Sequence, residues 1–111
     1  MIKPTIIRFE DLRRGGTIDF IGAEHGFPVT FILDRSQPGG GPRLHRHTYD
    51  EVWILEEGQV EFTVGDDTLA ADAGSVAIVP AGTPHRFTNT GTTPLRMVCI
   101  HPRANFETEW L

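Results

Sequence analysis

Apolar residues alternate with polar ones in short runs along most of the chain, and these runs are rich in β-branched and aromatic residues. A period of two is typical of β-strands that bury one face. Glycine, proline and acidic residues separate the runs and favour tight turns. The pattern predicts an all-β sandwich or barrel with strands at 5–9, 17–22, 28–34, 42–47, 51–57, 59–65, 67–71, 75–80, 85–90 and 94–102.

The same alternation assigns a face to each side chain, because residues two apart in a strand point to the same side. In the strand that begins at Gln59, the predicted inward residues are Val60, Phe62 and Val64. In the last predicted strand, Arg96 is expected at the surface. The opposite, inward face then carries Leu95, Met97, Cys99 and His101. One of the chain's five histidines is therefore expected to face the interior from this strand.

Length and composition indicate one compact unit. The chain has 111 residues, 39% of them hydrophobic, so we expect a single domain over residues 1–111. The first residues lack the pattern of a secretion signal, and no run reaches the roughly 18 apolar residues of a membrane span. Cys99 is the only cysteine, which excludes an intrachain disulfide. We expect a soluble, cytoplasmic protein that has no membrane partner.

The charge pattern argues against a nucleic-acid partner. The formal net charge is −5, and the basic residues are scattered along the chain. A nucleic-acid binder usually gathers them on one face. We therefore expect no nucleic-acid partner. A small-molecule partner is expected because a barrel of about eight strands can enclose one small ligand.

The stretch "LHRHTYDE" carries the strongest chemical signal. His45 and His47 share a face of one predicted strand, with Cα atoms about 6.6 Å apart, so both imidazoles can reach one ion. Glu51 opens the next strand and can turn its carboxylate toward them. His85 follows a proline and glycine turn at the start of another strand, and antiparallel pairing can bring it to the same place.

The spacing of these residues resembles that of the cupins, a family of small jelly-roll β-barrels. The first cupin motif is matched by Gly39, His45, His47, Glu51 and Gly58. The second is matched by Gly74, Pro80, Gly82, His85 and Asn89. All ten positions agree. The resemblance implies a double-stranded β-helix, or jelly-roll barrel, in which His45, His47, Glu51 and His85 hold a metal.

A site of three imidazoles and one carboxylate suits one divalent transition-metal ion, namely Fe, Mn, Ni or Zn. Octahedral geometry leaves two positions open, which suits chemistry better than a closed structural site. We expect a metal-dependent enzyme that acts on a small organic molecule. A dioxygenase-like oxidation is favoured, with isomerase or lyase chemistry next. The alternative is a non-catalytic barrel that binds or senses a small molecule.

Several further residues are candidates for the pocket. His101 is a candidate acid or base, and Tyr49 a candidate pocket-lining residue, so these two are the tentative catalytic residues. Core or rim positions without a chemical role are the alternative for both, and also for Met97 and Cys99. Arg43 is a candidate clamp for a substrate carboxylate, with a surface ion pair as the alternative.

Apolar residues at the predicted edges favour a homodimer. The run 5–9 is apolar, and Val98 and Ile100 are expected on the outer face of their strand, where a monomer would leave them in water. Pairing of the N-terminal strand with the partner's outer sheet would cover both surfaces. In the tail, we expect Phe106 and Trp110 on one side of a short helical turn that helps the association, with a tail folded onto its own barrel as the alternative.

Overall fold

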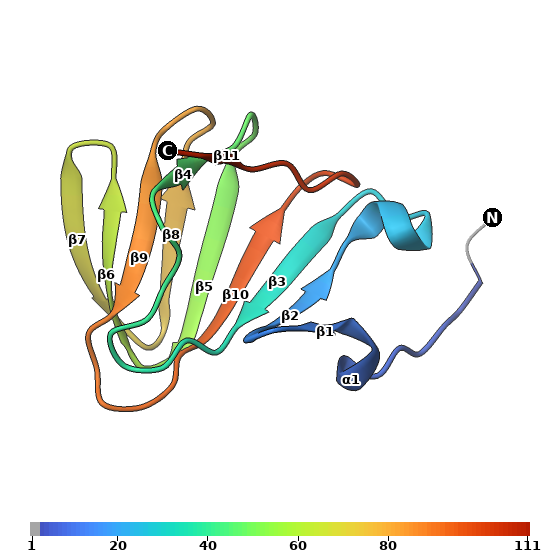
Figure 1. Ribbon diagram of the computed structural model, residues 1–111, viewed down its shortest axis with the longest axis horizontal. Helices are drawn as coiled ribbons and strands as arrows, with labels where there is room; N and C mark the ends of the chain where they lie inside the picture. Colours follow the sequence, from blue (N-terminus) through green and yellow to red (C-terminus); the bar gives the residue numbers. More distant parts are fainter. Residues whose placement is uncertain (1–2) are drawn as a thin grey trace.

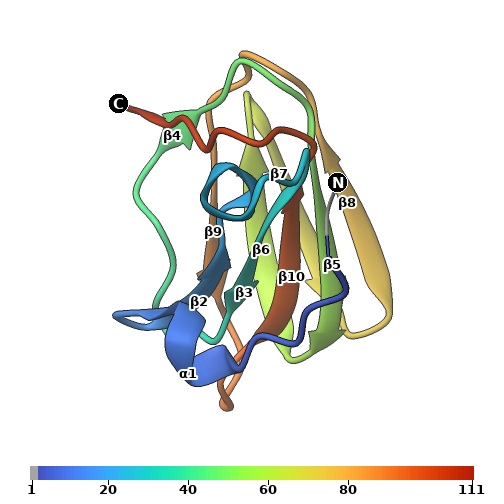
Figure 2. The same cartoon turned by 90° about the vertical axis from the view of Figure 1, so that its right-hand side faces the viewer.

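The computed structural model describes residues 3–111 and consists of two antiparallel sheets that face each other (Figures 1 and 2). The strands of the six-stranded sheet are β1 (Arg13–Arg14), β2 (Thr17–Phe20), β3 (Thr30–Asp34), β10 (Arg96–His101), β5 (Glu51–Glu57) and β8 (Ser75–Val79), in this spatial order. Those of the five-stranded sheet are β11 (Glu109–Trp110), β4 (His45–Arg46), β9 (His85–Asn89), β6 (Gln59–Val64) and β7 (Asp67–Asp72). The all-β jelly-roll prediction is confirmed.

The core lies between the sheets and is formed by the inward residues of the alternating strands. Trp53 and Leu55 of β5 face Val60 and Phe62 of β6 across the interior. Leu95, Met97 and Cys99 also belong to this cluster, so the faces predicted for these side chains are confirmed. Burial of such large apolar side chains is the main favourable contribution to folding.

A second, smaller apolar cluster covers part of the outer face of the six-stranded sheet. Leu12, Ile18 and Leu33 form its buried centre, and Ile7 and Val98 pack against it. Leu12 comes from a short helix, α1 (Phe9–Leu12). The expectation that a monomer leaves Val98 in water was therefore wrong, because the chain's own N-terminal region covers this side chain.

Two predicted segments adopt other conformations. Residues 5–8 are irregular and Phe9 opens α1, so the predicted strand at 5–9 is wrong. The tail does not form a helical turn, because Glu109 and Trp110 form β11 and pair with Arg46 and His45 of β4. Pairing with an edge strand gives the tail's backbone N–H and C=O groups more hydrogen bonds than one isolated helical turn would.

The helices of the described chain are α1 and a 3₁₀ turn, η1 (Gly22–His25), each of four residues. Within residues 3–111, therefore, no helix is long and apolar enough to cross a membrane. After β10 the chain crosses one end of the barrel to reach β4 (Figures 1 and 2). This crossing segment closes part of the interior where the histidines lie.

Candidate metal centre and cavity

The four residues predicted to hold a metal come together inside the barrel at the end crossed by the tail. His45 of β4 and His85 of β9 are direct cross-strand partners. His47 follows β4, and Glu51 opens β5. All four are buried, with exposed fractions of 7% or less. Strands distant in sequence therefore bring the predicted ligands to one place.

A tight turn helps to place His47 next to the strand that carries His85. The Gly82 amide donates to the carbonyl oxygen of His47 at 2.8 Å. Gly82 has a φ of 74°, a conformation that a residue with a Cβ adopts only with strain. The motif glycine therefore has a structural role in holding the two histidine-bearing segments together.

The backbone fixes the tautomer of each of these three histidines. Nδ1 lies 2.7 Å from the Arg43 carbonyl oxygen in His45, 2.6 Å from that of Glu107 in His47, and 2.8 Å from that of Thr83 in His85. A carbonyl oxygen only accepts, so Nδ1 must carry the hydrogen in every case. In a neutral imidazole, Nε2 then presents its lone pair.

Two of these lone pairs point at the same carboxylate oxygen. His47 Nε2 lies 3.2 Å and His85 Nε2 lies 3.3 Å from Glu51 Oε1. None of these three buried atoms has a hydrogen-bond partner. Three acceptors facing one another without a proton between them are costly when buried. A cation removes that cost, so the donor set fits a divalent transition-metal ion.

Burial and neighbouring groups keep two of the ligands, Glu51 and His45, in the protonation states that a metal needs. Burial by itself raises the pKa of Glu51, but the surrounding histidines, His101 foremost, lower this pKa well below its usual range. The Trp53 indole N–H also donates to Glu51 Oε2 at 2.7 Å, which leaves Oε1 for an ion. Burial lowers the pKa of His45 to about 4, so this imidazole stays neutral in weak acid.

His101 and Tyr49, the tentative catalytic residues, lie on the other side of Glu51. His101 Nε2 is 3.2 Å from Glu51 Oε2, and His101 Nδ1 is 2.8 Å from the Tyr49 hydroxyl. That hydroxyl also donates to the Glu107 carbonyl at 3.3 Å. Burial raises the pKa of Tyr49 to about 12. Tyr49 is thus a neutral phenol in contact with the imidazole.

Two overlapping groups of side chains have the geometry to hold an ion. One contains His45, His47 and His85, and the other contains His47, Glu51 and His101. The unpartnered atoms favour the first group together with Glu51 Oε1, because Glu51 Oε2 already accepts from Trp53. His101 therefore remains free for another role beside the ion.

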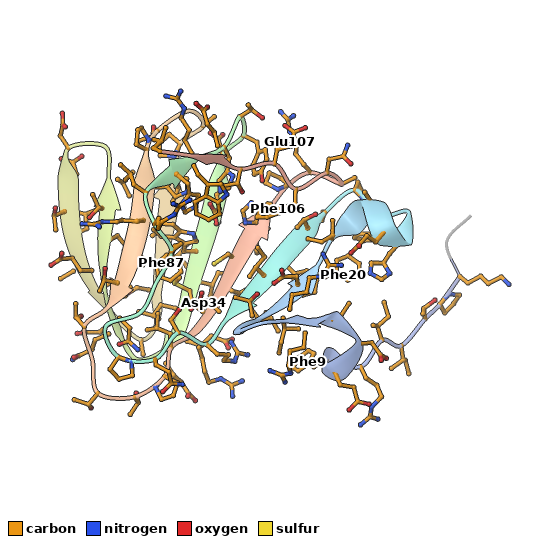
Figure 3. The ribbon with its side chains drawn as sticks, viewed as in Figure 1. Phe9, Phe20, Asp34, Phe87, Phe106 and Glu107 are labelled. Carbon is orange, nitrogen blue, oxygen red and sulfur yellow. The ribbon has the colours of Figure 1, made fainter. Side chains whose placement is uncertain are left out.

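His45, His47 and His101 line a cavity of about 210 Å³. Its apolar wall includes Ile32, Cys99, Phe106 and Trp110, and its other wall residues include Asp19 and Asp34. Figure 3 shows two of these residues, Asp34 and Phe106, at separate places in the molecule.

Sequence reasoning missed the two aspartates. The alternation in 17–22 and 28–34 was the available signal, since it places Asp19 on one face with Thr17, and Asp34 on one face with Ile32.

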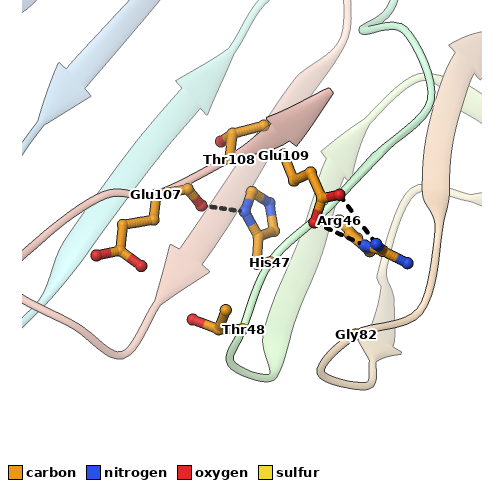
Figure 4. A pocket seen from close by; sticks show the side chains of 7 residues that line it. All are labelled: Arg46, His47, Thr48, Gly82, Glu107, Thr108 and Glu109. Atoms are coloured by element: carbon orange, nitrogen blue, oxygen red, sulfur yellow. Dashed lines mark hydrogen bonds and ion pairs between the residues drawn. The ribbon is translucent and has the colours of Figure 1, made fainter. Parts of the chain in front are cut away.

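A separate groove of about 300 Å³ lies at the rim, where the tail meets β4 (Figure 4). His47 is visible there with its bond to the Glu107 carbonyl, and Arg46 pairs with Glu109 at 2.9 Å. Two threonines, Thr48 and Thr108, also line the groove. In this groove the tail holds the His47 ring through the Glu107 carbonyl.

The remaining candidates have less direct positions. Cys99 lines the cavity, and burial raises the pKa of its thiol well above the usual value, with the charges of Glu51, Asp34 and Asp19 adding to the effect. Met97 is part of the core. Arg43 is not among the cavity's wall residues, because its guanidinium lies over the Trp110 ring at 5.1 Å.

The chain belongs to the cupin family, since the model of the cupin domain matches residues 33–101. A relative from Methanocaldococcus jannaschii, uncharacterized protein MJ1618, is 30% identical over 66% of this chain and 61% of its own length. Mannose-1-phosphate guanylyltransferase 2 of Escherichia coli is 29% identical over 80% of this chain. The chain spans only 18% of that enzyme.

Solved structures confirm the fold. A variant of Bacillus subtilis oxalate decarboxylase superposes with a TM-score of 0.82 at 21% identity, covering 95% of this chain and 31% of that one. Recombinant oxalate oxidase in complex with glycolate superposes with a TM-score of 0.75 at 20% identity, covering 85% of this chain and 53% of that one. At this identity, the likeness concerns the barrel alone.

Proposed function

We propose that residues 1–111 form one cupin domain that acts as a metal-dependent enzyme on a small organic molecule. Oxidation of the dioxygenase type is the favoured reaction, with isomerase or lyase chemistry next. The observation that carries the proposal is the approach of two lone-pair nitrogens, His47 Nε2 and His85 Nε2, to Glu51 Oε1 in a buried site. A structural core has no use for such an arrangement.

The chain's own residues have distinct roles in this proposal. Nε2 of His45, His47 and His85 and Oε1 of Glu51 hold one Fe, Mn, Ni or Zn ion. When bound, this ion supplies Lewis acidity and, where the metal is redox-active, electron transfer. Similar structures include one of B. subtilis oxalate decarboxylase described by its Mn(II) centres, which supports a transition metal.

His101 holds or moves a proton beside the reacting centre, and Tyr49 positions it. The Tyr49 hydroxyl can donate to His101 Nδ1, which places the imidazole proton on Nε2, toward Glu51. It can instead donate to the Glu107 carbonyl and accept from His101 Nδ1. The hydroxyl can therefore stabilise His101 both with a proton on Nε2 and with a free Nε2 lone pair, the two states between which a general acid or base passes when it gives or takes a proton.

The test is elemental analysis of protein from its native host, followed by turnover measurements after loading with Fe(II), Mn(II) or Ni(II). We expect up to one transition ion per chain, and oxygen consumption or product formation with a small organic substrate. Stoichiometric binding of small molecules without oxygen consumption or product would favour the alternative, a non-catalytic binding barrel. Absence of bound metal after loading would contradict both the metal site and the enzyme.

We further propose that two copies form a homodimer. Val76 and Ile78 of β8 are 65% and 72% exposed on the outer face of the six-stranded sheet. Ile6, in the segment that projects beyond β2 in Figure 1, is 96% exposed. Apolar side chains in such positions are typical of a contact surface. Light scattering at micromolar concentration should give about twice the chain mass of 12.3 kDa, and Ile78→Glu should give the monomer.

A matched control for the dimer is Leu69→Glu, which replaces an exposed apolar residue on the other sheet. This variant should remain a dimer. A wild-type chain that scatters as a monomer would refute the association.

A further inference from the structure

We propose that the cavity selects a small molecule with a hydrogen-bond donor, an ammonium or hydroxyl group, at the end away from the histidines, and that Asp19 and Asp34 bind this donor. A molecule that carries a carboxylate at both ends is excluded from the cavity. The inference rests on the proposed function, because it takes the same cavity as the substrate site.

Strand register places both aspartates on the inner face of the six-stranded sheet. Asp34 pairs with Met97, and Asp19 pairs with Ile32, which in turn pairs with Cys99. Paired residues share a face of the sheet, so both carboxylates point to the side that carries the core and the cavity. Both are among the residues that line the cavity.

Each carboxylate is held by one oxygen. The Ser36 amide donates to Asp34 Oδ1 at 2.8 Å, and the Thr17 hydroxyl donates to Asp19 Oδ1 at 2.6 Å. Within residues 3–111, neither carboxylate forms an ion pair. Asp34 is only 6% exposed and belongs to the wall of the cavity. Its second oxygen accepts no hydrogen bond within residues 3–111 and is not one of the fully buried atoms that lack a partner, so a molecule in the cavity can reach it. A carboxylate oxygen that lacks a donor from the protein favours a donor from the ligand.

The charge of the cavity favours the same class of ligand. Among the described residues of its wall, none is a lysine or an arginine, whereas three are acidic: Asp19, Asp34 and Glu51. A divalent ion leaves one net negative formal charge. Burial is the main cause of the raised pKa of the Cys99 thiol, and the charges of Glu51, Asp34 and Asp19 add to it, as expected beside an acidic wall. A dicarboxylate would place two further negative charges in the cavity.

The spacing of strands sets the size of the ligand. Asp34 lies on β3, two strands from β5, which is about 10 Å across the sheet at 4.8 Å per step. Through Met97 it is level with Leu55, four residues along β5 from Glu51, which adds about 13 Å in the strand direction at 3.3 Å per residue. The volume of about 210 Å³ is below the roughly 300–1,000 Å³ of common ligand sites. A chain of six carbons with one group at each end fits a cavity of this size and, with one end at the ion, extends toward the aspartates.

The experiment compares three molecules that differ only at the far end: 6-aminohexanoate, 6-hydroxyhexanoate and adipate. Their shared carboxylate can meet the metal end. Calorimetric titration uses the full chain loaded with Mn(II), whose metal content is measured in the same sample. We expect 6-aminohexanoate to bind tenfold or more tighter than adipate, with 6-hydroxyhexanoate between them, because a donor to a buried carboxylate is worth at least one decade in affinity.

The double variant Asp19→Asn/Asp34→Asn should reduce the difference between 6-aminohexanoate and adipate to less than threefold and should bind the same amount of metal. The control Asp66→Asn, on an exposed turn, should keep the wild-type preference. Adipate binding as tightly as 6-aminohexanoate, no binding of any of the three, or a preference that survives the double variant would overturn the inference. Retained metal in that case leaves the proposed function standing. Wild-type protein that holds no metal yet prefers 6-aminohexanoate to adipate would contradict only the proposed function.

Discussion

The two ends of the cavity are built on different principles. At the histidine end, each ring of His45, His47 and His85 is held by a backbone carbonyl, so the lone pairs are aimed before anything binds. At the aspartate end, each carboxylate has one bond and a free second oxygen. The first end is rigid and suits an ion with strict geometry. The second can adapt to different donors, which suits recognition of an organic group.

The largest expected effect separates these ends directly. His47→Ala/His85→Ala should lower metal affinity at least 100-fold, because it removes two of the four ligand atoms. Elemental analysis after dialysis checks this. His25→Ala should keep the metal, because His25 is exposed and stacks on Phe20 at 4.6 Å. The double variant Asp19→Asn/Asp34→Asn should also keep it. Stoichiometric metal in the double histidine variant would contradict the assignment of His47 and His85 as metal ligands.

A second substitution tests His101, which lines the same cavity. His101→Gln should lower turnover of the best substrate about 100-fold with metal content unchanged, as expected on losing a general acid or base. Tyr49→Phe removes only the hydroxyl, so it should shift the pH profile of kcat while KM changes little. An unchanged pH profile in Tyr49→Phe would assign this phenol a packing role.

Acidification should weaken the metal-free protein through its histidine end. Burial lowers the pKa of His45 to about 4, below the usual 6.5. Between these values the unfolded chain binds the proton and the folded chain does not, so the free energy of unfolding should fall as pH drops from 6.5 to 4. Urea titrations across this range measure it. His45→Gln should flatten the dependence, and an equal slope in this variant would exclude His45 as a cause.

The smallest expected effect is a change in the reactivity of the Cys99 thiol, which depends in part on the charges at the aspartate end of the cavity. The Cys99 thiol should react with iodoacetamide far more slowly than a free thiol at pH 8.5, because its pKa is raised by burial and by neighbouring carboxylates. Asp19→Asn/Asp34→Asn should speed this reaction severalfold, whereas Asp66→Asn should not. Equal rates in all three proteins would show that burial alone protects the thiol.

Local sequence determined much of the fold and of the histidine end. Alternation with a period of two predicted most strands and the inward faces of Val60, Phe62 and Met97, because one buried face imposes that period on any strand. The spacing of the two cupin motifs predicted that His45 and His85 would meet, and the structure pairs them directly. The cupin assignment itself is confirmed.

Only the tertiary structure decided the conformation of the ends of the chain and the chemistry of the aspartate end. Residues 5–9 and 105–111 carry apolar side chains compatible with strand or helix. The partner available in space selects the outcome, which is the outer cluster for Ile7 and the edge of β4 for Trp110. The position of Asp19 and Asp34 in the same cavity as the histidines likewise depends on the order β2-β3-β10-β5. Long-range pairing fixes that order, and nothing in the local pattern of either strand encodes it.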